Sequence, residues 1–280
     1  YAVIYKKQGQ NPNEKKMAKP TITPIVMNRD VASDFLKEIQ NSNVKPIEPV
    51  FLDFKKDLSQ LKAKSGIPVL YKQNTSNDLF QLIYVFDMGN NNDKALGTAF
   101  DYIDYLGTSD MTPEQVKSEF YRLACNFRVS PGNERTYVVL SGLNENMPEA
   151  MKLFEKLMAD AQVNKEAYTN MVADILKSRK DAKLNQMQNF RRLMNYGMYG
   201  PKSPATNILT ETELQTMDPQ ELTDRIHNQN SYKHRIMYYG PTSEKELLAI
   251  INKNHQAPKK LKEIPVGNEF PRLETPVTKV

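Results

Sequence analysis

Apolar and polar positions along the chain follow two different periods, and the first of them predicts strands. The segments "IPVLYKQN" (67–74) and "DLFQLIYVFDMG" (78–89) are short, rich in β-branched and aromatic residues, and bounded by turn residues. The second is almost continuously apolar, which indicates a central strand covered on one or both faces. We also expect a strand at "EPVFLDFKKDL" (48–58). The compact part of the chain is therefore expected to begin with a sheet near residue 48.

The second period is helical and dominates after residue 92. The helix predicted at 112–126 opens on Thr112, Pro113 and Glu114, which are typical first residues of a helix. A Pro131-Gly132 turn predicts a hairpin within "FRVSPGNERTYVVLSGL". The other predicted elements are helices at 93–106, 148–161, 164–200 (one or two), from 210 and from 218, a strand at 231–241, and a helix at 243–255. This order predicts an α+β fold of two layers, a mostly antiparallel sheet packed by helices.

Composition divides the chain into three parts. Residues 9–47 are rich in Pro, Asn and Lys, and residues 257–280 are basic and contain several prolines, so both indicate linkers. "YAVIYKK" at the start is expected to be the tail strand of a preceding domain. We therefore predict a tail strand and linker over 1–47, one domain over 48–256, and a linker to a following domain over 257–280.

The charge balance does not indicate a nucleic-acid partner. The net charge is +5 with a pI near 9.0, but the basic excess lies largely in the flanking segments, without interleaved aromatic residues for stacking. No run of 18 apolar residues predicts a membrane span. Cys125 is the only cysteine, which excludes an internal disulfide and a cysteine-based zinc site. We expect it to be buried on an apolar helix face.

Few residues offer a recognisable catalytic pattern. The three histidines, His227, His234 and His255, lack the spacing of a zinc pair on one helix and are expected on the surface. The chain has no G-x-S-x-G, no phosphate-binding loop and no dinucleotide fingerprint. Asp101 and Asp104 share a helix face after a strand that ends at Asp87. Carboxylates in this arrangement could act in acid–base chemistry or bind a cation, but helix capping and a solvated surface are the commoner roles.

A stripe of apolar residues marks the segment "NQMQNFRRLMNYGMYG" (185–200). Met187, Phe190 and Met194 recur at helical spacing. The stripe predicts a helix packed into the core, and a groove for a peptide or a nucleic acid is the alternative.

The order and spacing of these elements resemble one domain of the pitrilysin/insulinase zinc metallopeptidase family, which includes the mitochondrial processing peptidases. The matching stretches are "VLYKQNTSNDLFQLIYVFDMGNNND", "ALGTAFDYIDYLGT", "TPEQVKSEFYRLACNFRVSPGNERTYVVLSGL", "MPEAMKLFEKLMADAQVNKEAY" and "RIMYYGPTSEKELLAIINK". They cover about 49–256. Each stretch is degenerate, so the resemblance rests on their order.

The resemblance implies that the zinc site of the family is missing here. Catalytic domains of the family carry His-x-x-Glu-His shortly before a Gly-Thr, and a distal Glu completes the zinc site. Alignment on Gly107-Thr108 places Thr98 and Tyr102 at the histidine positions and Asp101 at the glutamate, and the distal ligand falls near Met171. Thr, Tyr and Met are poor zinc ligands. The resemblance therefore implies no catalytic residue, metal or cofactor in this chain, with zinc held by a catalytic domain of the parent protein.

Two functions follow from the resemblance. The first is an inactive peptidase-like domain of a larger zinc metalloprotease, which forms part of a chamber wall and binds peptide substrates while another domain performs proteolysis. Its partners would be other peptidase-like domains of the same polypeptide, and its location the bacterial periplasm. Arg191, Arg192, Tyr196 and Tyr199 are candidate substrate contacts. The alternative is a stand-alone, non-proteolytic scaffold or interaction protein of the same fold.

Overall fold

The computed structural model describes residues 3, 5, 9, 18–24 and 31–274, and it divides into two units, residues 1–51 and 52–280. Unit 1 contains helix α1 (Asp34–Asn41), which begins where the Ser33 hydroxyl accepts a hydrogen bond from the backbone N–H of Leu36. Its apolar side chains Phe35 and Ile39 are exposed. The predicted tail strand over 1–7 falls mostly on residues outside those described.

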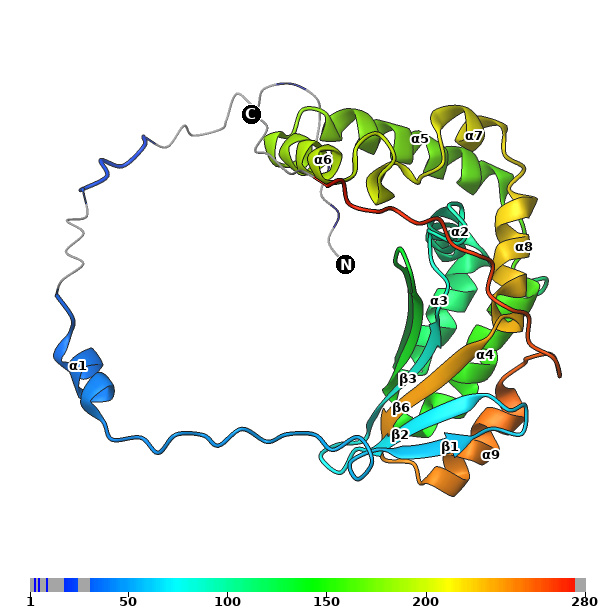
Figure 1. Cartoon of the computed structure of the whole chain (residues 1–280), viewed down its shortest axis with the longest axis horizontal. Helices are drawn as coiled ribbons and strands as arrows, with labels where there is room; N and C mark the ends of the chain where they lie inside the picture. The colour runs from blue at the N-terminus through cyan, green and yellow to red at the C-terminus, as the bar shows by residue number, and fades with distance from the viewer. Residues whose placement is uncertain (1–2, 4, 6–8, 10–17, 25–30, 275–280) are drawn as a thin grey trace. The chain divides into compact units, whose positions relative to one another are not determined.

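Unit 2 is built on a mixed sheet of six strands (Figure 1). The order across the sheet is β1-β2-β6-β3-β5-β4; only β2 and β6 pair in parallel, and the other pairs are antiparallel. Strand β3 lies inside the sheet, as its continuous apolar sequence predicted. The strands are β1 (Ser59–Lys62), β2 (Pro68–Gln73), β3 (Leu79–Phe86), β4 (Cys125–Pro131), β5 (Thr136–Leu143) and β6 (His234–Gly240).

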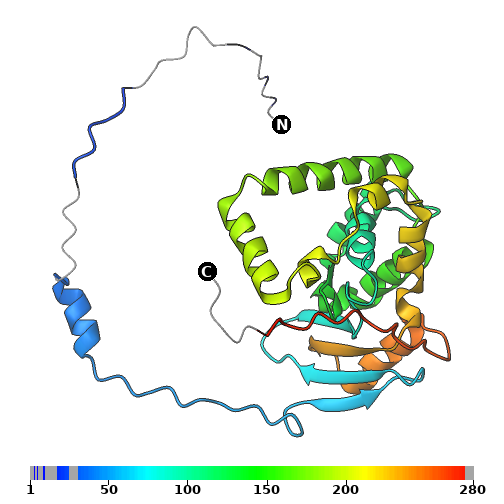
Figure 2. The same ribbon diagram turned by 45° about the horizontal axis from the view of Figure 1, so that its top comes forward.

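Helices cover one face of this sheet, so the α+β prediction is confirmed (Figures 1 and 2). The Thr112 capping box with Pro113 at the first turn starts α3 where the sequence predicted it. The helices are α2 (Leu96–Tyr102), α3 (Pro113–Arg122), α4 (Met147–Asp160), α5 (Lys165–Ala182), α6 (Gln186–Tyr199), α7 (Glu211–Thr216), α8 (Gln220–Asn228) and α9 (Glu244–Asn254), with 3₁₀ turns at η1 (Ile103–Tyr105), η2 (Asn144–Asn146), η3 (Pro204–Thr206) and η4 (Gln229–Ser231).

Alternation along the strands separates a buried face from an open one. Phe80, Leu82, Tyr84 and Phe86 of β3 point toward the helices and are at most 1% exposed. The opposite face carries mostly half-buried or exposed side chains, with Ile83 of β3 beside Val139 of β5 and Met237 of β6, and with Tyr137 and Tyr239 further along. Val85 of β3 is the buried exception on this face. We call this the open face.

The prediction of a strand at residues 48–58 is wrong, because side-chain hydrogen bonds to the backbone form a turn within this segment. The side chain of Asp53 accepts a hydrogen bond from the backbone N–H of Lys55 at 3.0 Å, and Asp57 accepts one from the N–H of Asp53 at 2.7 Å. Such carboxylate-to-backbone bonds favour a turn over an extended strand. The first strand starts only at Ser59.

Helix α6 also differs from the prediction, since none of its residues is buried. Met187, Phe190 and Met194, expected in the core, are 58%, 54% and 48% exposed. Figure 2 shows α5 extending away from the other helices to a corner, where α6 begins and turns back, so α6 lies outside the helix layer that packs on the sheet. The pattern correctly indicated a helix with one apolar face, but not whether anything covers that face.

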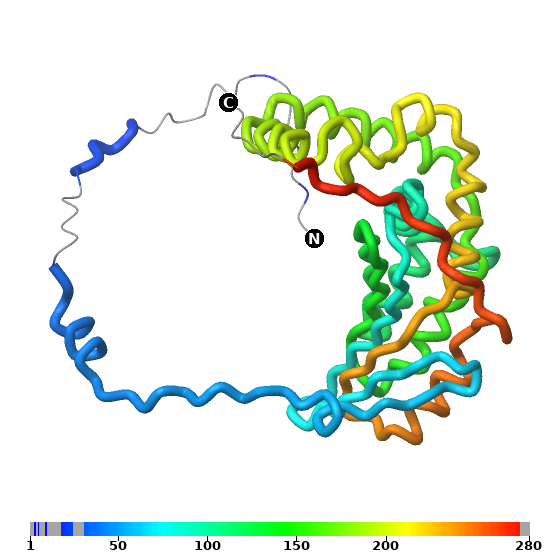
Figure 3. The backbone as a smooth tube through the Cα atoms, in the orientation of Figure 1, coloured from blue at the N-terminus to red at the C-terminus, as the bar shows by residue number. Residues whose placement is uncertain are grey.

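The segment from His255 to Glu274, which we call the C-terminal strap, lies along unit 2 (Figure 3). It runs from the end of α9 past α8 to the end of α6. Backbone hydrogen bonds hold it at Lys262 N–H to Ser231 O (2.7 Å), Asn268 N–H to Asn91 O (2.7 Å) and Leu273 N–H to Met198 O (2.7 Å). The region expected as a linker from residue 257 therefore follows the domain surface as far as the described residues reach.

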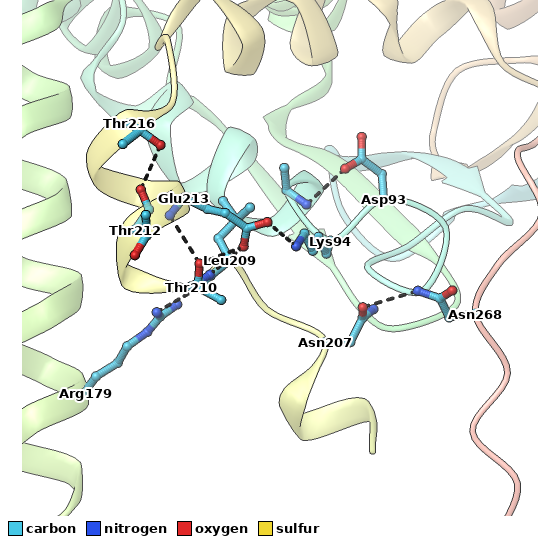
Figure 4. Close-up of polar contacts among 11 residues, drawn as sticks. Asp93, Lys94, Arg179, Asn207, Leu209, Thr210, Thr212, Glu213, Thr216 and Asn268 are labelled. Carbon is cyan, nitrogen blue, oxygen red and sulfur yellow. Dashed lines mark hydrogen bonds and ion pairs between the residues drawn. The ribbon is translucent and has the colours of Figure 1, made fainter. Parts of the chain in front are cut away.

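Polar contacts attach α7 to both α2 and α5 (Figure 4). Arg179 of α5 donates to the carbonyl of Leu209 at 2.7 Å, and Lys94, just before α2, pairs with Glu213 of α7 at 2.5 Å. Asn268 of the strap donates to the side chain of Asn207 at 3.3 Å in the same region. These contacts position α5 and α2 relative to each other.

Candidate functional site

Helix α2 carries the three positions that the family resemblance assigns to the zinc motif. It directly follows the loop after β3, where the Asn90 side chain accepts a hydrogen bond from the N–H of Gly97 at 2.9 Å. Thr98 is half-buried, Asp101 is exposed and Tyr102 is fully buried.

Tyr102 has a structural role at this position. Its hydroxyl donates to the carbonyl of Asn164 at 2.7 Å and accepts from the N–H of the same residue at 2.8 Å. Asn164 is the N-cap of α5, so the two bonds tie α2 to the start of α5. Burial raises the pKa of the Tyr102 phenol, which keeps it protonated as a donor.

The residues present do not fit a zinc ion. Met171, at the distal position, is buried on α5 and offers only a thioether sulfur. The Tyr102 hydroxyl is engaged on both sides, and Thr98 offers a neutral hydroxyl in place of an imidazole. Among the described residues, no group of three or more His, Cys, Asp or Glu side chains could hold a metal ion.

The three aspartates singled out in the sequence do not form one site. Asp87 pairs with Arg135 at 2.9 Å and with Arg235 at 2.6 Å, and these two cations hold its pKa below the usual range. Although Asp101 is exposed, partial desolvation of its carboxyl group by neighbouring atoms, together with the charge of Asp104, raises its pKa. Asp87, at the end of β3, therefore forms ion pairs with Arg135 beside β5 and with Arg235 of β6.

Strand β4 presents the feature that the sequence did not reveal, an edge with unpaired backbone groups. Antiparallel pairs alternate between those that exchange hydrogen bonds and those that do not. Gly132 donates to the carbonyl of Arg135 at 2.7 Å and Leu143 to that of Ala124 at 3.3 Å, which fixes this alternation at both ends. The N–H and C=O groups of Cys125, Phe127 and Val129 consequently point away from β5. No described strand pairs with this edge.

An apolar cavity of about 310 Å³ lies beside this edge, between η1, α3 and β4. Val116 and Phe120 of α3 form its wall together with Phe127, whose ring lies 5.0 Å from that of Phe120. Tyr121, 89% exposed, also lines it. The unpaired edge of β4 therefore lies next to a pocket that could hold an apolar side chain. This site can be recognised only once the order of the strands is known, because that order places β4 at the end of the sheet.

The proposed substrate contacts all lie on α6. Arg191, Arg192 and Tyr196 are exposed and Tyr199 is half-buried. Within the described part of the chain, no side-chain hydrogen bond or ion pair links them to α2 or β4. Their role in substrate binding stays a prediction.

Two further sequence expectations need correction. The His234 residue and the His255 side chain are buried rather than on the surface. His227 is half-buried, with its Nε2 3.0 Å from the carbonyl of Ala161. Cys125 is buried as expected, but it begins strand β4 instead of lying on a helix. Burial raises the pKa of its thiol, which disfavours the reactive thiolate.

A scan against protein-family models gives no match, and a search of curated proteins gives none. Solved structures do match. The periplasmic protease PqqL from Escherichia coli aligns with a TM-score of 0.67 at 14% identity over 93% of this chain and 28% of that chain. A peptidase M16 inactive domain from Pseudomonas fluorescens aligns with a TM-score of 0.63 at 16% identity over 76% of this chain and 54% of that one. The ferredoxin protease FusC, solved in complex with Arabidopsis ferredoxin, aligns with a TM-score of 0.65 at 10% identity over 83% and 27%.

This chain thus spans between about a quarter and about half the length of these neighbours. Identities this low establish the fold alone. The neighbours are M16-type peptidases and parts of them, including one inactive domain. Strand order, helix layer and comparisons lead to one conclusion: the chain has the fold of a pitrilysin-like domain of the M16 peptidases.

Proposed function

We propose that this chain is a non-catalytic peptidase-like domain of a larger zinc metallopeptidase, and that it binds extended peptides along the free edge of β4. The observation that carries the proposal is that edge, where three residues present unpaired backbone groups beside an apolar cavity. Edge strands of this kind accept an added strand through main-chain hydrogen bonds and read alternate side chains in pockets.

The side chains at the positions aligned with the zinc motif support the non-catalytic part of the proposal, because Thr98, Tyr102 and Met171 are poor zinc ligands. The Tyr102 hydroxyl braces α2 against α5, at a position where a catalytic domain of the family has a histidine. We expect the purified chain, after exposure to equimolar zinc and desalting, to retain far less than one zinc per chain and to cleave no peptide. One zinc per chain, lost on Asp101→Asn, would instead show a functional metal site on α2.

In the larger metallopeptidase, the open face of the sheet would line the chamber that holds the substrate. An exposed surface with Tyr137, Met237 and Tyr239 fits the wall of a chamber that holds unfolded peptide. Proteolysis itself would belong to another domain of the same polypeptide, as would the zinc. A periplasmic location follows the similarity to PqqL, which is a periplasmic protease. Among the described residues, no helix has both the length and the apolar character that a membrane crossing requires.

Backbone-methylated peptides test the edge directly. The probe is a short peptide of alternating leucine and serine, offered in two forms that carry N-methyl groups on opposite sets of alternate amides. Because only one set of amides faces β4 in an added strand, we expect one form to bind as the parent peptide does and the other to lose binding. Equal binding of both forms would contradict strand addition.

Variants of the protein test the location. Val129→Pro removes an outward N–H of β4, and Gln60→Pro is the matched control on the opposite edge strand β1. We expect only Val129→Pro to weaken peptide binding. Tyr121→Ser should lower affinity for the leucine-containing peptide because Tyr121 lines the cavity, while Tyr105→Ser, outside its lining, should not.

A further inference from the structure

Five polar side chains meet in the middle of the helix layer and form what we call the buried cluster: Tyr84 of β3, Glu155 of α4, Asn230 of η4, His234 of β6 and His255 after α9. The side chains of Glu155 and His255 are 1% and 2% exposed, and His234 is 7% exposed. Glu155 accepts hydrogen bonds from the Tyr84 hydroxyl at 3.1 Å and from Asn230 Nδ2 at 2.9 Å. Sequence analysis had placed both histidines on the surface.

The geometry fixes the number of protons in this cluster. His234 Nδ1 lies 2.7 Å from the carbonyl of Tyr232 and must donate to it. The two Nε2 atoms of His234 and His255 lie 2.9 Å apart, and His255 Nδ1 lies 2.5 Å from Glu155 Oε1. Each of these three contacts needs one proton between its two heavy atoms. The two imidazoles and the carboxylate therefore share three protons and are neutral as a group.

One more proton or one fewer breaks a contact. Glu155 Oε2 already accepts hydrogen bonds from Asn230 Nδ2 and from the N–H of Gln256. A fourth proton therefore goes to His234 Nε2, where it would meet the proton that His255 already donates. Loss of a proton would leave two lone pairs, or a carboxylate and a lone pair, facing each other in a buried site. Burial, and to a smaller degree the charge of His255, lower the pKa of His234 to about 4, in agreement with a neutral His234 ring.

The cluster also holds the beginning of the C-terminal strap. His255 is the C-cap of α9 and the first residue of the strap. The backbone N–H of the next residue, Gln256, donates to Glu155 Oε2 at 3.3 Å. Beyond this point the strap contacts the domain through the surface hydrogen bonds at Lys262, Asn268 and Leu273, and its partly buried side chains Ala257, Leu261 and Ile264 pack against the core. The contact of His255 with Glu155 and His234 is therefore the buried polar attachment of the strap, and its loss leaves only these weaker contacts.

We propose that the buried cluster is an acid-sensitive attachment for the C-terminal strap: uptake of one proton by His234 separates His255 from His234 and frees the strap, while the sheet stays folded. Proton uptake is favoured in the released state because His234 is then solvated and no longer faces a donor. The device makes the path of the chain after α9 dependent on pH.

Other charged groups around the cluster are paired or solvated. A cavity of about 670 Å³ between α4 and α9 includes Glu155 in its lining and gives solvent a route to the cluster. Lys233 pairs with Glu263 of the strap, and Arg235 pairs with Asp87. The titratable and charged groups on the packed elements are Tyr84 on β3; Glu149, Lys152, Glu155, Lys156 and Asp160 on α4; Arg235, Tyr238 and Tyr239 on β6; Glu244, Lys245, Glu246 and Lys253 on α9; and Lys259, Lys260, Lys262, Glu263, Glu269, Arg272 and Glu274 on the strap.

Hydrogen exchange of backbone amides tests the proposal on the whole chain. Protection factors of Lys262, Asn268 and Leu273 are compared with those of β3 between pH 7 and pH 4.5. Because release takes up one proton, protection of the strap should fall by at most tenfold per pH unit below about 6.5, while β3 keeps its protection. Loss of protection in the strap and β3 together, or in neither, would overturn the proposal.

Two substitutions test whether the pH dependence of strap protection comes from the buried cluster or from a general effect of acid on the protein. His234→Gln removes the titrating ring, so strap protection should no longer change with pH in this range. His227→Gln is the matched control, since His227 lies outside the cluster, and it should keep the wild-type pH dependence. An unchanged pH dependence in a folded His234→Gln protein would contradict the proposal.

A spectroscopic measurement on the wild-type chain covers the case in which His234→Gln does not fold. Nitrogen-15 shifts of the ring atoms should show His234 protonated at Nδ1 alone at pH 7, and at both nitrogens when the strap amides have lost protection. Double protonation of His234 while the strap stays protected would overturn the proposal.

Discussion

Helices α2 and α6 each carry an apolar stripe, yet the two stripes end in opposite environments. Leu96, Ala99 and Phe100 share one face of α2 and are 1%, 0% and 3% exposed, whereas the stripe of α6 contains no buried residue. The difference shows that amphipathicity specifies which side of a helix can be covered, and that the rest of the fold decides whether it is. The predictions below test this contrast, from the largest expected effect to the smallest.

The largest effect is expected in the packed layer. Phe100→Ala should lower the free energy of unfolding by about 3 to 5 kcal/mol, because it leaves a cavity in a core that cannot collapse fully. Urea unfolding measures the loss, and Phe100→Leu, which keeps most of the volume, should cost clearly less. A small loss for Phe100→Ala would mean that α2 is as loosely covered as α6.

Acid should weaken the packed layer through His234. In the unfolded chain this residue titrates near 6.5, whereas in the fold its pKa is lowered to about 4 by burial. Between these values the unfolded state binds a proton that the folded state does not, so stability is fully present above pH 6.5 and falls as the pH drops. The total loss is about 3 kcal/mol.

The check on this pH dependence is a difference measurement. Unfolding free energies of the wild type and of His234→Gln are compared at pH 7 and pH 4.5, which cancels the contribution of carboxylates with lowered pKa such as Asp87. The wild type should lose more stability than the variant. Identical losses would assign the acid sensitivity to other groups.

Tyr102→Phe should cost less, about 1 to 3 kcal/mol. The ring stays in place, but the backbone N–H and C=O of Asn164 lose their buried partner. Tyr105→Phe is the control, since that side chain is 45% exposed, and it should be neutral in the same unfolding measurement. A neutral Tyr102→Phe would remove the evidence that Tyr102 braces α2 against α5.

The smallest effect is expected on α6. Phe190→Ala should change the unfolding free energy by no more than about 0.5 kcal/mol, because the ring is 54% exposed. Thermal or urea unfolding of this variant beside Phe100→Ala gives the comparison directly. A loss similar to that of Phe100→Ala would show that something covers α6 in solution.

The elements that the sequence predicted well are those whose signals are local. Strands β2 and β3, the β4–β5 hairpin and the capped start of α3 each depend on residues within one segment, such as Thr112 and its capping box. The strand expected at 48–58 failed because Asp53 and Asp57 bond to the nearby backbone, a competing local signal that apolar counting does not register.

The candidate sites depended on contacts that no local pattern contains. His255 is buried because Glu155, a hundred positions earlier, accepts its Nδ1–H, and an isolated histidine in a polar segment gives no sign of such a partner. Strand β4 becomes an edge because it pairs only with β5, whose other side is taken by β3. The aligned residue types predict that Thr98 and Tyr102 replace the histidines of the zinc motif, but they give no sign of the hydrogen bonds by which Tyr102 joins α2 to α5.

The insertion of β6 also bears on how the domain folds. Val69 of β2 pairs with Ile236 of β6, and Ile236 in turn pairs with Tyr84 of β3, so the two early strands do not touch each other. During synthesis, β2 and β3 must wait for a strand that leaves the ribosome long after them. Such non-local pairing slows folding. Until β6 has been synthesised, the nascent chain leaves one edge of the apolar strand β3 without its partner, which favours aggregation over folding.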